Sequence, residues 1–322
     1  MFVRYLVAMV MAAALSALGL PVHAQGSYPN KPVRMIVPFP PGQATDIIAR
    51  FLADSLTKAW GQQVIVDNRP GVQGMVAGRD APADGYTITF GTSGTLAVTP
   101  AVFSKLPYDP VKDYIMVSGG VIIPMIIVAD SALPYNSLKE LIDAAKKAPG
   151  KLNVGYGGVN NTQHLTGELF KYTTGVDMVG INYKGSAAAV TDLLGGQIQI
   201  LVDSLAATLP HIKSGKMKAL AISTLQRVPQ MPDLPTVAEL GYPGFEGVGW
   251  AGIVVPKGTS SEIVEKIGAD VRRALSDPAL RERILDRGMT VDGRAPKEWS
   301  EFVNAEIVKW SEAARRANVK AD

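Results

Sequence analysis

The loop at residues 38–46 combines residue types that can bind an anion at the start of a helix. The residues before it, Val33–Val37, form a short apolar run rich in β-branched residues, which is typical of a buried strand. The prolines at the start of the loop cannot continue a central strand, and apolar residues recur at helical spacing from 47 to 56. Thr45 or Asp46 stands where a helix N-cap is expected.

This strand–loop–helix unit predicts an anion site for a physical reason. The N–H groups in the first turn of a helix lack intrahelical partners, and the aligned peptide dipoles place partial positive charge there. A ligand can approach the backbone closely at Gly42, and Thr45 offers a hydroxyl. The alternative is an ordinary strand-to-helix turn with a capping residue.

Two more polar loops follow predicted strands. Residues 91–95 (Gly-Thr-Ser-Gly-Thr) follow a strand predicted at 87–90, and residues 157–162 (Gly-Gly-Val-Asn-Asn-Thr) follow one at 152–156. Strands alternate with helical segments along the chain, which predicts an α/β protein with mostly parallel sheets. Because ligands bind beyond the carboxyl ends of such strands, we expect the loops at 38–46 and 91–95 to lie together.

Several short motifs resemble those of the Bug family, the extracytoplasmic solute receptors of tripartite tricarboxylate transporters. The first is Pro-Phe followed by Gly42 and Asp46, where the family usually has Gly-Gly-x-x-Asp, and Gln43 stands in place of the second glycine. The other motifs follow in the family's order over nearly the whole chain after residue 24: Asn68-Arg69-Pro70-Gly71, Gln163-His164-Leu165, Tyr183-Lys184-Gly185, Asp192-Leu193-Leu194-Gly195-Gly196, Pro235-Thr236-Val237-Ala238-Glu239 and the strand that begins at Trp250.

The resemblance implies a two-lobed, Venus-flytrap (type II) periplasmic binding protein, each lobe a mostly parallel sheet flanked by helices. We place lobe 1 at residues 25–124 and 246–322 and lobe 2 at residues 125–245. The resemblance also implies a small carboxylate as ligand (a dicarboxylate, tricarboxylate or aromatic acid), held between the lobes, and a tripartite tricarboxylate-type membrane permease as partner. A monomer is the default expectation.

The expected ligand-binding residues lie on the loops at the ends of the predicted strands. They are Phe39, Gly42, Gln43, Ala44, Thr45, Asp46, Thr92, Ser93, Gly158, Asn160, Asn161, Thr162, Tyr183, Lys184 and Asp203. Core packing is the alternative role for Phe39, a helix cap or internal hydrogen bond for Asp203, and solvation for Lys184. The two asparagines and Gln43 also suggest a ligand with polar groups beyond one carboxylate.

The N-terminus predicts export to the periplasm. Arg4 precedes an apolar run at residues 6–20, and Val22-His23-Ala24 ends in the small residues that a signal peptidase accepts. We therefore expect a signal peptide at residues 1–24, with an uncleaved membrane anchor as the alternative. The chain has no cysteine, which excludes disulfides, a thiol nucleophile and cysteine metal sites.

The composition excludes two classes of protein. The 322 residues are 47% hydrophobic and 19% charged, as in a globular protein rather than a disordered one. The formal net charge is only +3, and the sequence has no basic stripe with interleaved aromatic residues, so we expect no nucleic acid partner.

An enzyme is the competing interpretation. Beyond residue 24 the histidines are His164 and His211, and they lack metal-ligand spacing. Residues 91–95 lack the second glycine of a nucleophile elbow, and residues 155–160 lack the last glycine of a dinucleotide fingerprint. We expect no enzyme, no metal and no cofactor. A periplasmic hydrolase with Ser93 as nucleophile, or a ligand-sensing partner of a membrane kinase, are the alternatives.

Overall fold

A ten-stranded mixed sheet organises residues 31–321. The computed structural model describes residues 28–321, so the predicted signal peptide at residues 1–24 lies outside the described range. The elements are β1 (Val33–Val37), α2 (Ala44–Trp60), β2 (Val64–Asn68), α3 (Val72–Arg79), β3 (Thr87–Thr92), η1 (Gly94–Val98), α4 (Thr99–Val102), β4 (Tyr114–Asp130), α5 (Leu138–Lys147), β5 (Asn153–Tyr156), α6 (Thr162–Thr174), β6 (Val179–Asn182), α7 (Ser186–Leu194), β7 (Ile200–Ser204), α8 (Leu205–Lys213), β8 (Met217–Ile222), β9 (Val248–Pro256), α9 (Ser261–Leu275), α10 (Pro278–Asp286), β10 (Thr290–Val291) and α11 (Pro296–Arg316).

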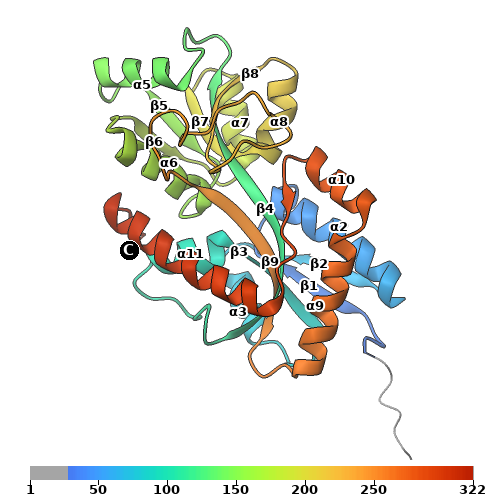
Figure 1. The fold of residues 1–322 in the computed structure, drawn as a ribbon. Helices are drawn as coiled ribbons and strands as arrows, with labels where there is room; N and C mark the ends of the chain where they lie inside the picture. The colour runs from blue at the N-terminus through green and yellow to red at the C-terminus, as the bar shows by residue number, and fades with distance from the viewer. Residues whose placement is uncertain (1–27, 322) are drawn as a thin grey trace, which may run out of the picture. The chain divides into compact units, whose positions relative to one another are not determined.

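The long strand β4 joins two halves of this sheet (Figure 1). From Tyr114 to Pro124 it pairs with β9, and from Met125 to Ala129 it pairs with β7. We call β1–β3, β9, β10 and the β9-paired part of β4 the first half. The second half is β5–β8 together with β4 from Met125 onward. The strand order is β2-β1-β3-β9-β4-β7-β5-β6, with β8 and β10 also paired to β4.

The parallel order predicted from the sequence holds for the strands that carry the polar loops. β1 pairs in parallel with β2 and β3, and β5 pairs in parallel with β6 and β7. The strands β4 and β9 add the antiparallel pairs, because each runs against its neighbours. The carboxyl ends of β1 and β3 in the first half, and of β5, β6 and β7 in the second, therefore open onto loops that can share one site.

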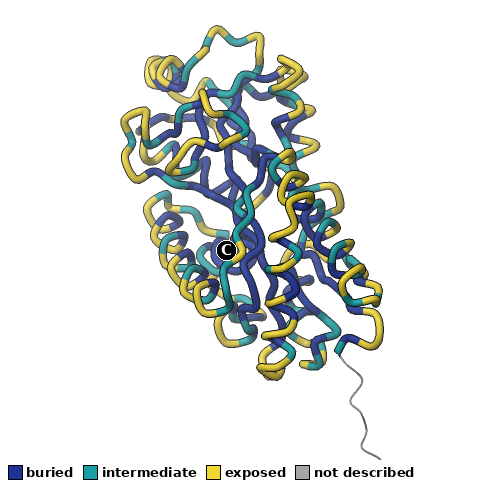
Figure 2. Tube along the Cα trace, turned by 45° about the vertical axis from the view of Figure 1, so that its right-hand side comes forward, coloured by how far each residue is buried: buried dark blue, intermediate teal, exposed yellow. Residues whose placement is uncertain are grey.

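The helices cover the sheet with their apolar faces. In α2 the buried residues include Ile48, Leu52 and Leu56 at helical spacing, and Gly61 ends the helix in the left-handed conformation with φ 64°. The C-terminal helices return to the first half, where α9 contacts α2 and β4, and α11 contacts η1 and α4. Figure 2 shows the resulting pattern of buried strands beneath helices with exposed outer sides.

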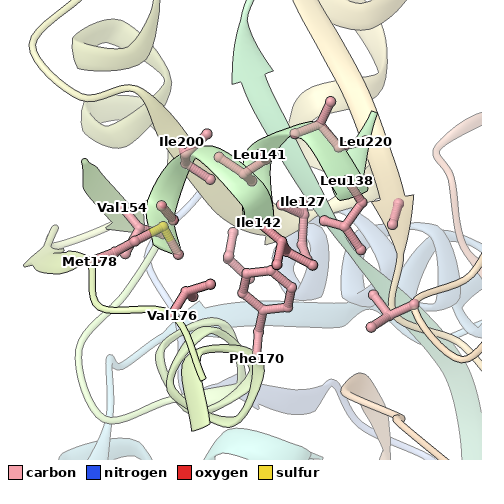
Figure 3. Close-up of a cluster of buried hydrophobic side chains, with 14 of the residues drawn as sticks. Ile127, Leu138, Leu141, Ile142, Val154, Phe170, Val176, Met178, Ile200 and Leu220 are labelled. Carbon is pink, nitrogen blue, oxygen red and sulfur yellow. The ribbon is translucent and has the colours of Figure 1, made fainter. Parts of the chain in front are cut away.

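Each half has its own buried core. In the second half, α5 directs Leu138, Leu141 and Ile142 onto a cluster that also contains Ile127 and Phe170 (Figure 3). In the first half, three fully buried tryptophans dominate: Trp250, Trp299 and Trp310. These cores are apolar and close-packed, so the polar loops between the halves lie on a rigid support.

Two predicted segments differ from the structure. Residues 91–95 were expected to form a loop, but Gly91 and Thr92 extend β3 opposite Gly252 and Ala251, and Gly94–Val98 forms a π-helical turn. The proline-rich sequence at residues 229–244 predicts a crossover with a short helix at 236–240, but the chain makes only a turn there. Prolines on both sides of this segment leave too few residues to nucleate a helix.

Candidate functional site

The polar loops of the two halves enclose a small cavity of about 30 Å³, here named the inner cavity. This volume has room for one or two water molecules. Residues of both halves line it: Phe39, Gln43, Ala44, Thr45, Thr92, Ser93, Ile123, Met125, Thr162, Gln163, Ser186, Ser204, Gly249 and Trp250.

A larger depression of about 300 Å³, here named the outer groove, lies on the solvent side of the same loops. Residues of both halves line it as well: Pro38, Phe39, Pro40, Gln43, Pro70, Gly71, Gly94, Thr95, Thr99, Gly158, Val159, Asn160, Asn161 and Lys184. Phe39 and Gln43 are the residues common to the two linings.

The structure brings most of the expected ligand-binding residues to these two spaces. The inner cavity takes Phe39, Gln43, Ala44, Thr45, Thr92, Ser93 and Thr162, and the outer groove takes Gly158, Asn160, Asn161 and Lys184 together with Phe39 and Gln43. The remaining expected residues, Gly42, Asp46, Tyr183 and Asp203, line neither space. The hydroxyl of Tyr183 donates to Asp192 at 2.7 Å, within the second half.

Asp46 does not line the inner cavity, and its hydrogen bonds instead fix the Pro-rich loop before α2. Its carboxylate accepts from the Gly42 N–H at 2.8 Å, from Asn68 Nδ2 at 2.9 Å and from Arg50 Nε at 3.1 Å. Burial opposes ionisation of Asp46, but the hydrogen bonds from Arg50, Gly42 and Asn68 outweigh it, so the pKa of Asp46 lies below its ordinary value.

The expected N-cap at Thr45 or Asp46 was wrong, because α2 begins at Ala44 with Gln43 as its N-cap.

Four helices point their N-termini at the inner cavity. Its lining includes Ala44 and Thr45 at the start of α2, Thr162 and Gln163 at the start of α6, Ser186 at the start of α7 and Ser204, the N-cap of α8. The N-cap residue of α2, Gln43, makes no capping hydrogen bond with its side chain, and the N-cap residue of α7, Gly185, has no side chain to make one. First-turn N–H groups of these two helices therefore stay available to an anion.

The polarity of the inner cavity comes from hydroxyl and amide groups, since its lining contains no Lys, Arg, Asp or Glu. Ser93 of the first half and Thr162 of the second form a hydrogen bond between their hydroxyls at 2.7 Å. The backbone N–H of Trp250 donates to the same Ser93 oxygen at 3.2 Å. This cavity suits an anion that is held by dipoles rather than by counter-charges.

Asp203 lies directly behind the cavity wall and is 0% exposed. Its Oδ1 accepts from the Ser204 N–H at 2.6 Å, from Ser186 Oγ at 2.9 Å and from Gln163 Nε2 at 3.5 Å, while its Oδ2 has no partner. Burial raises the pKa of Asp203 to about 6, against these hydrogen bonds, which lower it. Asp203 therefore positions three residues of the cavity lining instead of lining it.

Sequence reasoning missed seven residues of the inner lining: Ile123, Met125, Gln163, Ser186, Ser204, Gly249 and Trp250. A signal existed for Ser186 and Ser204, because serine between a strand and a helix is a preferred N-terminal residue. Gln163 lies in the first turn of α6, directly after the expected residue Thr162. Ile123 and Met125 of β4 and Gly249 and Trp250 of β9 reach the cavity because β4 runs from one half of the sheet to the other and β9 pairs with it as far as Pro124.

The geometry does not favour the hydrolase alternative. The Ser93 hydroxyl is engaged with Thr162 and the Trp250 N–H, whereas His164 Nδ1 accepts from the Asn160 N–H at 3.3 Å. Burial lowers the pKa of His164. Within residues 28–321, no group of three or more His, Asp or Glu side chains is placed to hold a metal ion.

Comparisons with known proteins agree on one family. The family model described as "Tripartite tricarboxylate transporter family receptor" matches residues 48–319. The solved structure of Rpa4515 from R. palustris with adipate is 34% identical, with a TM-score of 0.86 over 91% of this chain and 99% of that chain. MatC from Rhodopseudomonas palustris with bound malate is 32% identical, with a TM-score of 0.81 over 89% and 99%.

The periplasmic binding protein BugD is also similar, at 35% identity with a TM-score of 0.83 over 91% of this chain and 99% of that chain. These likenesses extend over both halves of the sheet. The fold is therefore the two-lobed α/β fold of periplasmic binding proteins.

Proposed function

This chain belongs to the family of tripartite tricarboxylate transporter receptors, and we propose that it captures a small carboxylate between two lobes and delivers it to a membrane permease of that transporter type. One observation carries the proposal. The inner cavity lies between the two halves of the sheet, has no charged side chain in its lining, and receives the N-termini of four helices.

A carboxylate fits this cavity for electrostatic reasons. A negative group near a helix N-terminus is stabilised by about 0.3 to 2 kcal/mol, so several converging helices add up to a useful binding free energy. The apolar lining residues Phe39, Ile123, Met125 and Trp250 suit a carbon chain between or beside the carboxyl groups. The ligands of two similar proteins, adipate and malate, are both small dicarboxylates.

We assign residues 25–124 and 246–322 to lobe 1 and residues 125–245 to lobe 2. The change of partner in β4, from β9 at Pro124 to β7 at Met125, supports the first boundary. The inner cavity has room for only one or two waters, which is too small for a whole dicarboxylate, so we propose that the lobes separate to admit the acid and then close around it. Ligand favours the closed form only through the contacts that it gains there.

We also assign the mature protein to the periplasm, as a monomer, after cleavage following Ala24. Family membership and the sequence of residues 1–24 support this location. Across the described part of the chain, no helix is long and apolar enough to span a membrane.

A thermal-unfolding screen tests the proposal. The mature protein is heated with adipate, malate, citrate, glutamate or benzoate, and in parallel with the neutral amide of each acid. An acid at one hundred times its dissociation constant should add about 2.7 kcal/mol to the free energy of unfolding, which raises the melting temperature by several degrees. We expect a shift with at least one acid and none with its amide.

A ligand retained from expression would hide this shift, so the protein is unfolded, dialysed and refolded before the screen. Denaturing mass spectrometry of the untreated sample identifies any retained acid. A refolded protein that no carboxylate stabilises would contradict the proposal.

A further inference from the structure

We propose that Gln43 determines which carboxylates fit, because its amide spans the cleft to Gly185 and separates the inner cavity from the outer groove. The inference rests on the proposed function, since it concerns the carbon-chain length of the captured acid. With the Gln43 side chain between the two spaces, the form that closes on a ligand has less room along the carbon chain, so it binds compact acids better than longer ones.

The backbone of Gln43 is held firmly at the mouth of the cavity. The preceding Gly42 donates its N–H to Asp46 at 2.8 Å, and Asn68 donates to the carbonyl oxygen of Phe39 at 3.0 Å. Gln43 is the N-cap residue of α2, yet its side chain makes no capping hydrogen bond. The amide therefore extends away from its own helix, and its position depends on what lies opposite.

Gly185 lies opposite, as the N-cap residue of α7 in the second half. A Cβ atom placed on Gly185 would lie 2.9 Å from Gln43 Nε2, and no other atom outside residues 184–186 in the described part of the chain would lie within 4 Å of it. The φ of Gly185 is 163°, an extended conformation that any residue adopts. Because Gly185 has no Cβ, the side-chain amide of Gln43 has room beside it. The large Gln43 and the small Gly185 are therefore complementary in size across the cleft.

The residues that line the two spaces show which side chains lie between the inner cavity and the outer groove. Gln43 and Phe39 are the residues that line both the inner cavity and the outer groove. Shortening Gln43 joins an inner space of about 30 Å³ to an outer one of about 300 Å³. The carbon chain of a longer acid could then continue past Phe39 towards Val159 and Asn161, which line the outer groove.

The test measures dissociation constants by calorimetry for linear mono- and dicarboxylates of two to eight carbons, with the wild type and Gln43→Ala. We expect the ratio of six-carbon to four-carbon affinity to rise about tenfold in Gln43→Ala, since two more methylene groups become enclosed. Gln197→Ala is the matched control, because Gln197 lines neither the inner cavity nor the outer groove, and its ratio should stay within about twofold of the wild type.

A double-mutant cycle tests the pairing itself. In the wild-type background, Gly185→Ala should displace the amide and shift the chain-length ratio, whereas in the Gln43→Ala background it should change the ratio less than about twofold. Equal effects of Gly185→Ala in both backgrounds, or an unchanged ratio in Gln43→Ala, would overturn the inference and leave the proposed function standing. Loss of all carboxylate binding in the refolded wild type would overturn both.

Discussion

At the scale of single residues, the buried carboxyl of Asp203 orders the inner cavity from behind. Three donors converge on its Oδ1, two of them from the side chains of Ser186 and Gln163, and no group satisfies Oδ2. An ionised carboxyl in such a place is costly, and burial accordingly raises the pKa of Asp203 to about 6. The cavity lining is therefore held by a group that destabilises the fold when it is charged.

Asp203→Asn should change how stability depends on pH. Below about pH 4 the carboxyl is protonated in both the folded and unfolded chains. Between pH 4 and 6 only the unfolded chain releases this proton, so the free energy of unfolding falls by up to roughly 3 kcal/mol as the pH rises. Asparagine does not titrate, so the variant should gain about that much relative to the wild type between pH 4 and pH 7.

Urea unfolding of both proteins at pH 4, 5, 6 and 7 measures this difference. Other carboxyl groups titrate in the same range, but they do so in both proteins and cancel in the comparison. A difference in the free energy of unfolding between the two proteins that stays constant from pH 4 to pH 7 would show that folding does not raise the pKa of Asp203.

The sequence predicted which loops form the site better than it predicted the role of each residue. Loop positions follow from strand and helix patterns, which are local. Whether a carboxylate faces the cavity depends on side chains far away in the sequence. Asp46 is turned from the cavity by Asn68, and Asp203 is covered by Gln163 and Ser186, and no local pattern reports these contacts.

At the scale of elements, a buried glutamate joins β9 to α11 beside the site. Glu306 Oε2 accepts from the indole N–H of Trp250 at 2.7 Å and of Trp310 at 2.9 Å, while its Oε1 accepts from Lys309 at 2.9 Å. Trp250 also lines the inner cavity. The last helix of the chain thereby fixes one wall of the site.

Glu306→Ala should destabilise the protein by about 3 to 5 kcal/mol, because it leaves two buried indole N–H groups without an acceptor and breaks a partly buried ion pair with Lys309. Glu312→Ala is the matched control on the same helix, since Glu312 forms an exposed pair with Arg316, and it should change stability by less than about 1 kcal/mol. Urea unfolding at pH 7 measures the stability of both variants. Equal losses in the free energy of unfolding would contradict the proposal that Glu306 stabilises the contact between β9 and α11.

Helix starts were predictable because capping chemistry is local. The sequence predicts a cap at Ser260 or Ser261 and helix starts at Asp277 and Pro296, and in the structure Ser260 and Asp277 cap α9 and α10 while α11 begins at Pro296. The sequence predicts a strand only at residues 125–128, whereas β4 begins at Tyr114, because a glycine such as Gly119 is typical of a break in a strand. In the structure a Cβ on Gly119 would lie 2.6 Å from the Asp292 carbonyl oxygen, so glycine is needed there for close packing between segments.

At the scale of the whole molecule, the proposed opening and closing of the lobes would depend on contacts between the halves away from the cavity. Gln230, in the proposed lobe 2, donates its amide N–H groups to the carbonyl oxygens of Leu285 at 3.0 Å and Met289 at 3.2 Å, at the end of α10 and just beyond it. Gln230 lines neither the inner cavity nor the outer groove. These bonds therefore join the proposed lobe 2 to the segment around the end of α10 at a distance from the proposed ligand site.

Gln230→Ala should weaken carboxylate binding by about five- to 150-fold, because two hydrogen bonds of about 0.5 to 1.5 kcal/mol each would be lost from the closed form of the proposed mechanism. Calorimetry with the acid found in the thermal screen measures the loss, and small-angle scattering should show a larger radius of gyration without ligand and an unchanged one at saturation. Gln197→Ala is the matched control, since Gln197 donates to the Gly195 carbonyl within lobe 2. If both variants lose affinity equally, the contact between Gln230 and α10 does not contribute to closure.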